Sequence, residues 1–153
     1  MKYPKWAYED FEPGAVIQLG TKTVTAEEIV DFASQFDMQP MHLDEEAGKA
    51  SLLGGLAASG WHTCCMFMRL MCDGFLLDST SQGAPGVDYV RWKRPVLAGD
   101  TLTAAATILS KRESASRPGI GIVACRHEMT NQRGEVVLEL QHSAMFGMRR
   151  AAA

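Results

Sequence analysis

The sequence predicts an α+β fold: a single domain over residues 1–153 in which an antiparallel sheet wraps around a long, buried central helix. Two observations predict it. Residues 60–77 are apolar at almost every position, as expected of a helix that other elements enclose. After residue 86 the pattern changes to four strand-like runs separated by Gly, Pro and Asn turn signals, at 87–96, 101–110, 119–130 and 134–148.

The N-terminal segment contains an irregular arm over residues 1–13, which ends at Pro13-Gly14. Residues 15–19 and 21–24 follow as two short predicted strands around Gly20. At the other end of the chain, residues 149–153 are expected to form a frayed tail.

A capping box starts the first helix. Thr25 can accept a hydrogen bond from the amide of Glu28, and the Glu28 carboxylate can reach back to the amide of Thr25. Apolar residues with helical spacing then follow at Ile29, Phe32, Ala33 and Phe36. The helix is therefore expected to bury that face and to end directly before Asp37.

The turn after this helix carries an acid and a base. Asp37 and His42 lie five positions apart, and Pro40 between them prevents the helix from continuing. A carboxylate and an imidazole held together can position and activate a water molecule. Asp44 is then placed to cap a short helix at 45–50, and Ser59 to cap the central helix.

Composition excludes several functional classes. A hydrophobic content of 46% and a charged content of 22% are typical of a soluble globular domain, and a net charge of −3 offers no basic face for nucleic acid. Residues 1–12 lack the apolar run of a signal peptide, and charged residues interrupt the apolar stretch 61–77. We therefore expect a cytoplasmic protein that binds neither nucleic acid nor a membrane.

The cysteines do not form a metal-ligand pattern. Their spacing favours reduced thiols that pack as small apolar side chains, at Cys64, Cys65, Cys72 and Cys125. The chain also lacks a glycine-rich phosphate-binding loop. We predict neither a metal nor a nucleotide cofactor.

Several motifs resemble those of one family. They are Asp37-x-x-x-x-His42 followed by Leu43-Asp44, Ser59-Gly60 at the start of the central helix, and Arg94-Pro95-x-x-x-Gly99-Asp100 between strands. From about residue 16 to residue 146 the chain resembles the MaoC-like dehydratases, including the (R)-specific enoyl-CoA hydratases. The resemblance implies a hot-dog fold and a hydro-lyase of fatty acid metabolism that acts on acyl-CoA thioesters.

Three positions depart from the pattern of that family. Gln39 stands where asparagine is common, and Ser59 stands where histidine often precedes the glycine. In the hydratases a serine further along the central helix orients the aspartate, and the matching position here is Met68.

The resemblance also implies roles for single residues. Asp37 and His42 would activate water, and coenzyme A would enter only as part of the thioester substrate. The Gly60 N–H, which has no partner in the first turn of a helix, suits the thioester carbonyl, and a glycine lets the acyl group approach closely. Gln39 and Ser59 are expected beside the substrate.

Other interpretations stay open. A hot-dog acyl-CoA thioesterase and a non-catalytic acyl-binding hot-dog protein share the same scaffold. The acid and base could be a solvated loop acid and a capping imidazole, Gln39 could brace the loop, and Ser59 is a helix cap rather than a nucleophile. His62 is expected to be a satisfied histidine of the core or of an interface, and His127 and His142 receive no role.

A basic cluster and an uncovered sheet edge indicate which partners the chain could bind. Arg91, Lys93 and Arg94 form either an exposed strand face, with Trp92 pointing inward, or a contact for the phosphates of coenzyme A. One such domain leaves a sheet edge and one side of the central helix uncovered. We therefore predict a homodimer or a dimer of dimers, with the acyl tunnel near the interface.

Overall fold

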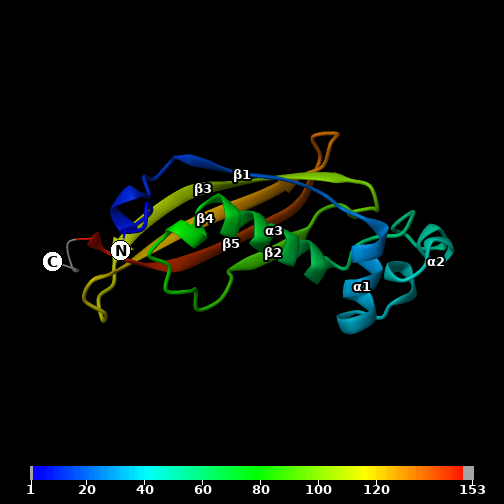
Figure 1. Cartoon of the computed structure of the whole chain (residues 1–153), viewed down its shortest axis with the longest axis horizontal. Coiled ribbons are helices and arrows are strands. Elements are labelled where there is room, and N and C mark those ends of the chain that lie inside the picture. Colours follow the sequence, from blue (N-terminus) through cyan, green and yellow to red (C-terminus); the bar gives the residue numbers. More distant parts are fainter. Residues whose placement is uncertain (1, 150–153) are drawn as a thin grey trace.

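The computed structural model describes residues 2–149 and contains a five-stranded antiparallel sheet with one long helix running along it (Figure 1). The strands are β1 (Val16–Thr23), β2 (Tyr89–Trp92), β3 (Thr101–Glu113), β4 (Ile120–Thr130) and β5 (Val136–Gly147), in the spatial order β1-β3-β4-β5-β2. The helices are α1 (Ala26–Phe36), α2 (Glu45–Ala50) and α3 (Gly60–Gly74), with short 3-10 turns at Tyr8–Asp10, Pro40–His42 and Leu76–Asp78. This arrangement confirms the α+β hot-dog prediction.

The two strands predicted before residue 25 form one strand, β1. Its pairing with β3 shifts register between Gln18 and Gly20, and Gly20 has a φ of +104°. Glycine adopts a positive φ without the steric cost of a Cβ, so the strand bends at this bulge without ending.

Helix α1 starts as predicted. Thr25 accepts from the Glu28 amide at 3.2 Å, and the Glu28 carboxylate accepts from the Thr25 amide at 3.1 Å. Ile29 and Ala33 are buried, but Phe36 is 74% exposed, so the last turn projects beyond the core. Figure 1 shows α1 and α2 together at one end of the sheet. This end carries the predicted functional turn.

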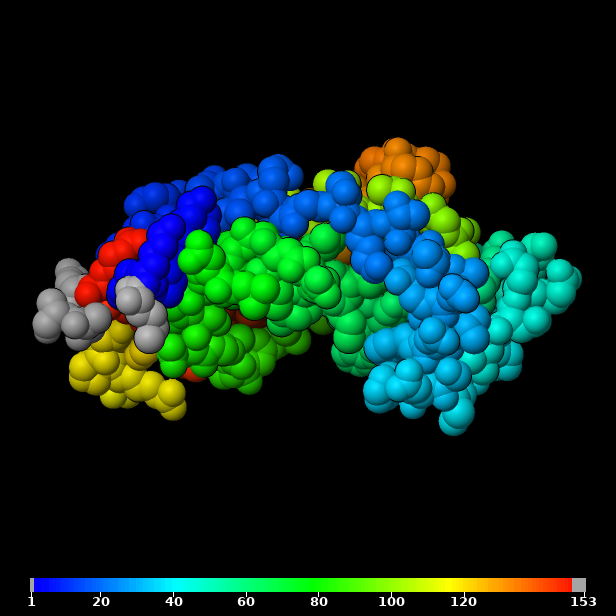
Figure 2. Space-filling model, viewed as in Figure 1, coloured from blue at the N-terminus to red at the C-terminus, as the bar shows by residue number. Residues whose placement is uncertain are grey.

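Helix α3 packs only one side against the sheet. Its side chains at Met66, Phe67, Leu70 and Met71 are buried, whereas Trp61 is 60% and Met68 is 47% exposed. Figure 2 shows the green segment around α3 uncovered on this face of the chain. One side of the central helix is therefore uncovered in a single chain, as the sequence predicted. None of the helices within residues 2–149 is long and apolar enough to cross a membrane.

Two predicted boundaries differ from the structure. Helix α3 ends at Gly74 rather than at residue 77, and a 3-10 turn continues the chain. Gly74 packs against Leu19, where a Cβ on Gly74 would lie 2.8 Å from the Leu19 Cδ2. Strand β2 spans four residues instead of the ten predicted, because only these pair with β5.

The first and last described segments of the chain contact each other. In the N-terminal arm, Tyr8 lies in a 3-10 turn and Phe11 is only 1% exposed. Arg149, expected in a frayed tail, forms an ion pair with Asp10 at 2.6 Å and donates its amide to Glu9. The rest of that predicted tail, residues 150–153, lies outside the described residues.

Candidate active site

Asp37 is held as a carboxylate at the end of α1. Its backbone amide closes the helix by donating to Ala33, and its side chain turns toward the start of α3. Ser59 Oγ donates to Oδ2 at 2.7 Å, and Gln39 Nε2 donates to Oδ1 at 2.8 Å. The bond from Ser59, and then the bond from Gln39, lower the pKa of Asp37 below its usual value. Both carboxylate oxygens are thus engaged and fixed in direction.

His42 presents one ring nitrogen to this carboxylate. The side chain is buried, and Nδ1 lies 2.7 Å from the carbonyl oxygen of Ala57. A carbonyl oxygen can only accept, so Nδ1 carries the proton, and Nε2 of the neutral ring has a free lone pair. Nε2 lies 3.5 Å from Asp37 Oδ2. The site therefore places two acceptors side by side, an arrangement that one water molecule can bridge by donating to both.

Ser59 joins the two halves of the site. Its side chain is fully buried, and its oxygen accepts from the amide of Trp61 at 3.3 Å while its proton goes to Asp37. The predicted cap is confirmed, but the bond to Asp37 was not foreseen from the sequence. The hydroxyl that orients the carboxylate is thus at Ser59 and not at Met68, which lies nine residues further along α3 and is largely exposed.

Gly60 begins α3 beneath the side chain of Trp92. The Trp92 Nε1 donates to the Gly60 carbonyl oxygen at 2.8 Å, and a Cβ on Gly60 would lie 2.6 Å from the Trp92 Cε2. A side chain at this position would therefore have to displace the indole of Trp92. Trp92 is 45% exposed and contacts Trp61 edge to face, so the prediction that it points inward is wrong.

A cavity of about 300 Å³ adjoins these residues. Its lining includes His42, Gly60 and Thr63 on one side and Trp92, Arg94 and Val96 on the other. The buried ring of His42 borders this cavity directly. Asp37 is not part of the lining, and its carboxylate is linked to the cavity by its contact with His42. The cavity is of the size of a small-ligand site.

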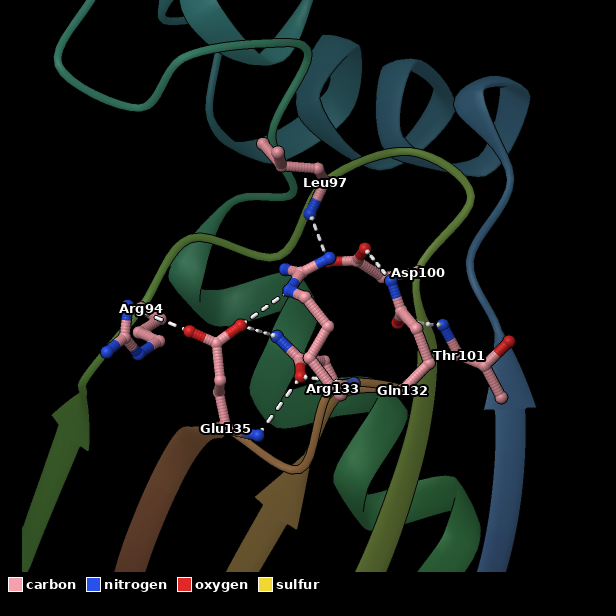
Figure 3. A network of polar contacts seen from close by, with 8 residues as sticks. Arg94, Leu97, Asp100, Thr101, Gln132, Arg133 and Glu135 are labelled. Carbon is pink, nitrogen blue, oxygen red and sulfur yellow. Dashed lines mark hydrogen bonds and ion pairs between the residues drawn. The ribbon is translucent and has the colours of Figure 1, made fainter.

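A polar network holds the wall of this cavity (Figure 3). Asp100 is buried and accepts from the Leu97 amide and from Gln132 Nε2, each at 3.0 Å. Glu135 forms ion pairs with Arg133 and, at 3.0 Å, with Arg94. The Arg-Pro and Gly-Asp motifs thus attach the segment before β3 to the β4–β5 hairpin, which positions the lining residues that lie between them.

The basic cluster around β2 is partly neutralised. Lys93 lies 3.0 Å and Arg91 4.0 Å from carboxylate oxygens of Glu139. All three basic side chains are exposed, as expected for an outward strand face, and Arg94 also borders the cavity. Lys93 and Arg94 therefore border the cavity with acidic neighbours beside them, whereas Arg91 is not part of its lining.

The other histidines and the cysteines do not line this cavity. His62 is buried against the ring of Phe32 and burial lowers its pKa, which confirms the predicted burial, but its Nδ1 has no hydrogen-bond partner among residues 2–149 and is not satisfied as predicted. His127 and His142 contact each other at 3.1 Å, a pairing that nothing in the sequence indicated. The four cysteines are free thiols, and residues 2–149 contain no group of three His, Cys, Asp or Glu side chains that could hold a metal.

Comparison with known proteins identifies the family of the chain. A family model described as "MaoC like domain" matches residues 10–127. The crystal structure of the MaoC-like dehydratase from Rhodospirillum rubrum is 39% identical, with a TM-score of 0.84, over 94% of this chain and 97% of that chain. The (R)-hydratase from A. caviae shares the fold at 21% identity, with a TM-score of 0.70 over 92% of this chain and 98% of that chain. The mesaconyl-CoA hydratase of Cereibacter sphaeroides is 40% identical over 63 residues, 41% of this chain and 18% of that protein. The chain belongs to the MaoC-like dehydratase family.

Proposed function

We propose that this protein is an acyl-CoA hydratase or dehydratase that adds water to an enoyl-CoA thioester or removes it. The observation that carries the proposal is the pair of acceptors formed by Asp37 Oδ2 and His42 Nε2, 3.5 Å apart at the edge of a cavity. Similarity to hydratases and dehydratases supports the same reaction class.

In the proposed reaction, one water molecule donates a hydrogen bond to each of the two acceptors. His42 is the stronger candidate for the general base. The hydrogen bonds from Ser59 and Gln39 lower the pKa of Asp37, which makes its carboxylate a weak base. As the water oxygen attacks the β-carbon, His42 Nε2 takes a proton from the water, and the imidazolium then gives this proton to the α-carbon. Asp37 holds the water and stabilises the imidazolium that forms.

The start of α3 is proposed to polarise the thioester carbonyl. Gly60 is the first helical residue, so its N–H has no acceptor within the helix and lies at the positive end of the helix dipole. Negative charge develops on that carbonyl oxygen during the reaction. A donor aimed at such charge contributes about 3 kcal/mol in other enzymes.

Coenzyme A would be held as part of the substrate. Lys93 and Arg94 border the cavity mouth, and guanidinium and ammonium groups suit the phosphates of a CoA ester. We propose no separate cofactor and no metal.

Assay of crotonyl-CoA hydration, followed by loss of the enoyl absorbance, tests the function. Asp37→Asn and His42→Gln are each expected to reduce kcat at least ~100-fold, because each removes one partner of the water. Asp44→Asn is the matched control, since Asp44 caps α2 and asparagine caps equally well. Unchanged hydration in Asp37→Asn would refute the proposal. Thiol release without a hydroxyacyl product would indicate the thioesterase alternative, and binding without turnover would indicate the acyl-binding one.

We also propose that a second copy covers the open side of α3 and the β2 edge. Large apolar side chains are exposed there, with Trp61 at 60%, Val87 at 55% and Met68 at 47%. A homodimer, or a dimer of dimers, would bury them near the cavity. Sedimentation at micromolar concentration should show a dimer that Met68→Glu dissociates, whereas Leu109→Glu, 37% exposed on β3, leaves it intact. A wild-type monomer would contradict this.

A further inference from the structure

A second cavity lies further along α3. It has a volume of about 270 Å³ and is lined mainly by apolar side chains, among them Phe67, Met68 and Met71 of α3 and Leu140 of β5. His142 is the titratable imidazole in this lining. An apolar cavity with one polar group is the usual form of a site that selects its ligand by a single hydrogen bond.

The two cavities follow one another along the same helix. The α3 residues of the first cavity are Gly60 and Thr63, and the second begins one residue later, at Cys64. Trp92 stands between them, because its indole contacts the Gly60 carbonyl and the thiol of Cys64. An acyl chain that extended along α3 from a thioester at Gly60, past the indole of Trp92, would reach the second cavity.

His142 belongs to a buried pair. His127 of β4 and His142 of β5 are 1% and 7% exposed, and His127 Nε2 lies 3.1 Å from His142 Nδ1. Burial lowers the pKa of both, that of His127 to about 3, so both rings are neutral at pH 7. One ring must then donate and the other accept in this contact.

The second nitrogen of His127 decides which ring donates. His127 Nδ1 is buried and has no hydrogen-bond partner among residues 2–149. A buried N–H without an acceptor is rarer and costlier than a buried lone pair without a donor. The proton of His127 is therefore on Nε2, which donates to His142 Nδ1. In consequence, the proton of His142 is on Nε2.

The Nε2–H of His142 is available to a ligand in the cavity. The other nitrogen of this ring is occupied by His127, and Nε2 forms no hydrogen bond within the described part of the chain, while the carboxylate of Asp88 acts on the ring only through its charge. The group is a neutral donor among apolar walls. A ligand that places a hydrogen-bond acceptor there gains a bond, whereas a purely aliphatic chain leaves the donor without one.

We propose that His142 donates a hydrogen bond to a neutral oxygen, of a keto or hydroxyl group, on the distal part of the acyl chain. The substrate class is then a medium-chain enoyl thioester that carries such an oxygen. This inference rests on the proposed function. The ring of His127 packs on Phe67 with centroids 4.7 Å apart, which places the pair at the level of Phe67. Phe67 is seven residues beyond Gly60, about 10 Å along a helix at about 1.5 Å per residue. A carboxylate is disfavoured because these walls would desolvate its charge.

Binding of saturated, unreactive esters tests the site without requiring turnover. Titration calorimetry should show that 7-oxooctanoyl-CoA binds wild-type protein about tenfold more tightly than octanoyl-CoA, the equivalent of one neutral hydrogen bond. His142→Phe should remove this preference and His142→Gln, which keeps an N–H, should retain part of it. Met68→Leu, a control in the same cavity without a change in polarity, should keep it in full.

Two further results bear on the inference. Long-range ¹H–¹⁵N correlation spectra of the wild-type protein should show both His127 and His142 protonated at Nε2. A His142 protonated at Nδ1, or equal wild-type affinity for the two esters, would overturn the inference, even if crotonyl-CoA is hydrated. The oxo preference without hydration of any enoyl-CoA would instead overturn the proposed function and leave the binding site standing.

Discussion

Replacing Ser59 by alanine perturbs both ends of one short link in the structure. The hydroxyl donates to Asp37 Oδ2 at 2.7 Å and accepts from the Trp61 amide at 3.3 Å. The side chain is fully buried, so solvent is not positioned to take its place. Ser59→Ala therefore removes a donor from the carboxylate and a cap from α3 at the same time.

The two losses have different sizes. A hydrogen bond to a charged group contributes about 1.5–3 kcal/mol, and loss of a serine cap costs about 1 kcal/mol of stability. The first loss acts on Asp37, whose side chain is 18% exposed and keeps a second donor in Gln39. If the bond from Ser59 orients the carboxylate during the reaction, its removal should lower kcat/KM roughly ten- to a hundredfold.

Ser59→Gly separates the two effects. Glycine is a good N-cap and costs only a few tenths of a kcal/mol there, but it cannot donate to Asp37. Both variants should therefore lose similar amounts of crotonyl-CoA hydration activity, while Ser59→Gly keeps more of its stability in urea unfolding. Wild-type kcat/KM in Ser59→Gly would refute the reasoning and reduce Ser59 to a helix cap.

Ser59→Ala is also expected to change the pH dependence of stability. The pKa of Asp37 is lowered below 3.8 in the folded protein. Its ionised form therefore stabilises the fold fully at pH values above 3.8, and this stabilisation is lost as the pH falls through the lower pKa of the folded state. Ser59→Ala moves the folded pKa back toward 3.8. Relative to wild type, the variant should thus be destabilised most at pH 7, and the difference should shrink in unfolding titrations below pH 3.8.

Three further substitutions test the surroundings. Gln39→Ala removes the second donor to the carboxylate, but from an exposed side chain, so kcat/KM should fall only several-fold; a loss as large as that of Ser59→Ala would contradict this. Gly48→Ala should lower Tm, because the added Cβ would overlap the backbone carbonyl oxygen of Gly55, although alanine normally stabilises a helix by ~0.5–1 kcal/mol. Gly86→Ala, which has open space around the added Cβ, is the control. Asp100→Ala leaves the partly buried amide of Leu97 without its acceptor and should cost ~1–3 kcal/mol in urea unfolding; an unchanged midpoint would show that the network in Figure 3 contributes nothing.

Local signals in the sequence predicted local structure well. The capping box at Thr25 and the cap at Asp44 were both confirmed, because each depends on residues within one turn of the chain. The sheet was also predictable, since its last three strands are neighbours in sequence joined by short turns. The short length of β2 was not, because strand length is set by pairing with β5, which lies about 50 residues away.

The sequence by itself determined that an acid and a base stand on one turn after a capped helix, because a proline and the helical period fix that turn locally. Only the tertiary structure decided what each side chain faces. Ser59 reaches Asp37 across 22 residues, Trp92 closes over Gly60, and His127 and His142 meet across two strands. These contacts join distant segments, and their direction depends on how the whole sheet packs on α3, which no spacing within a single element encodes.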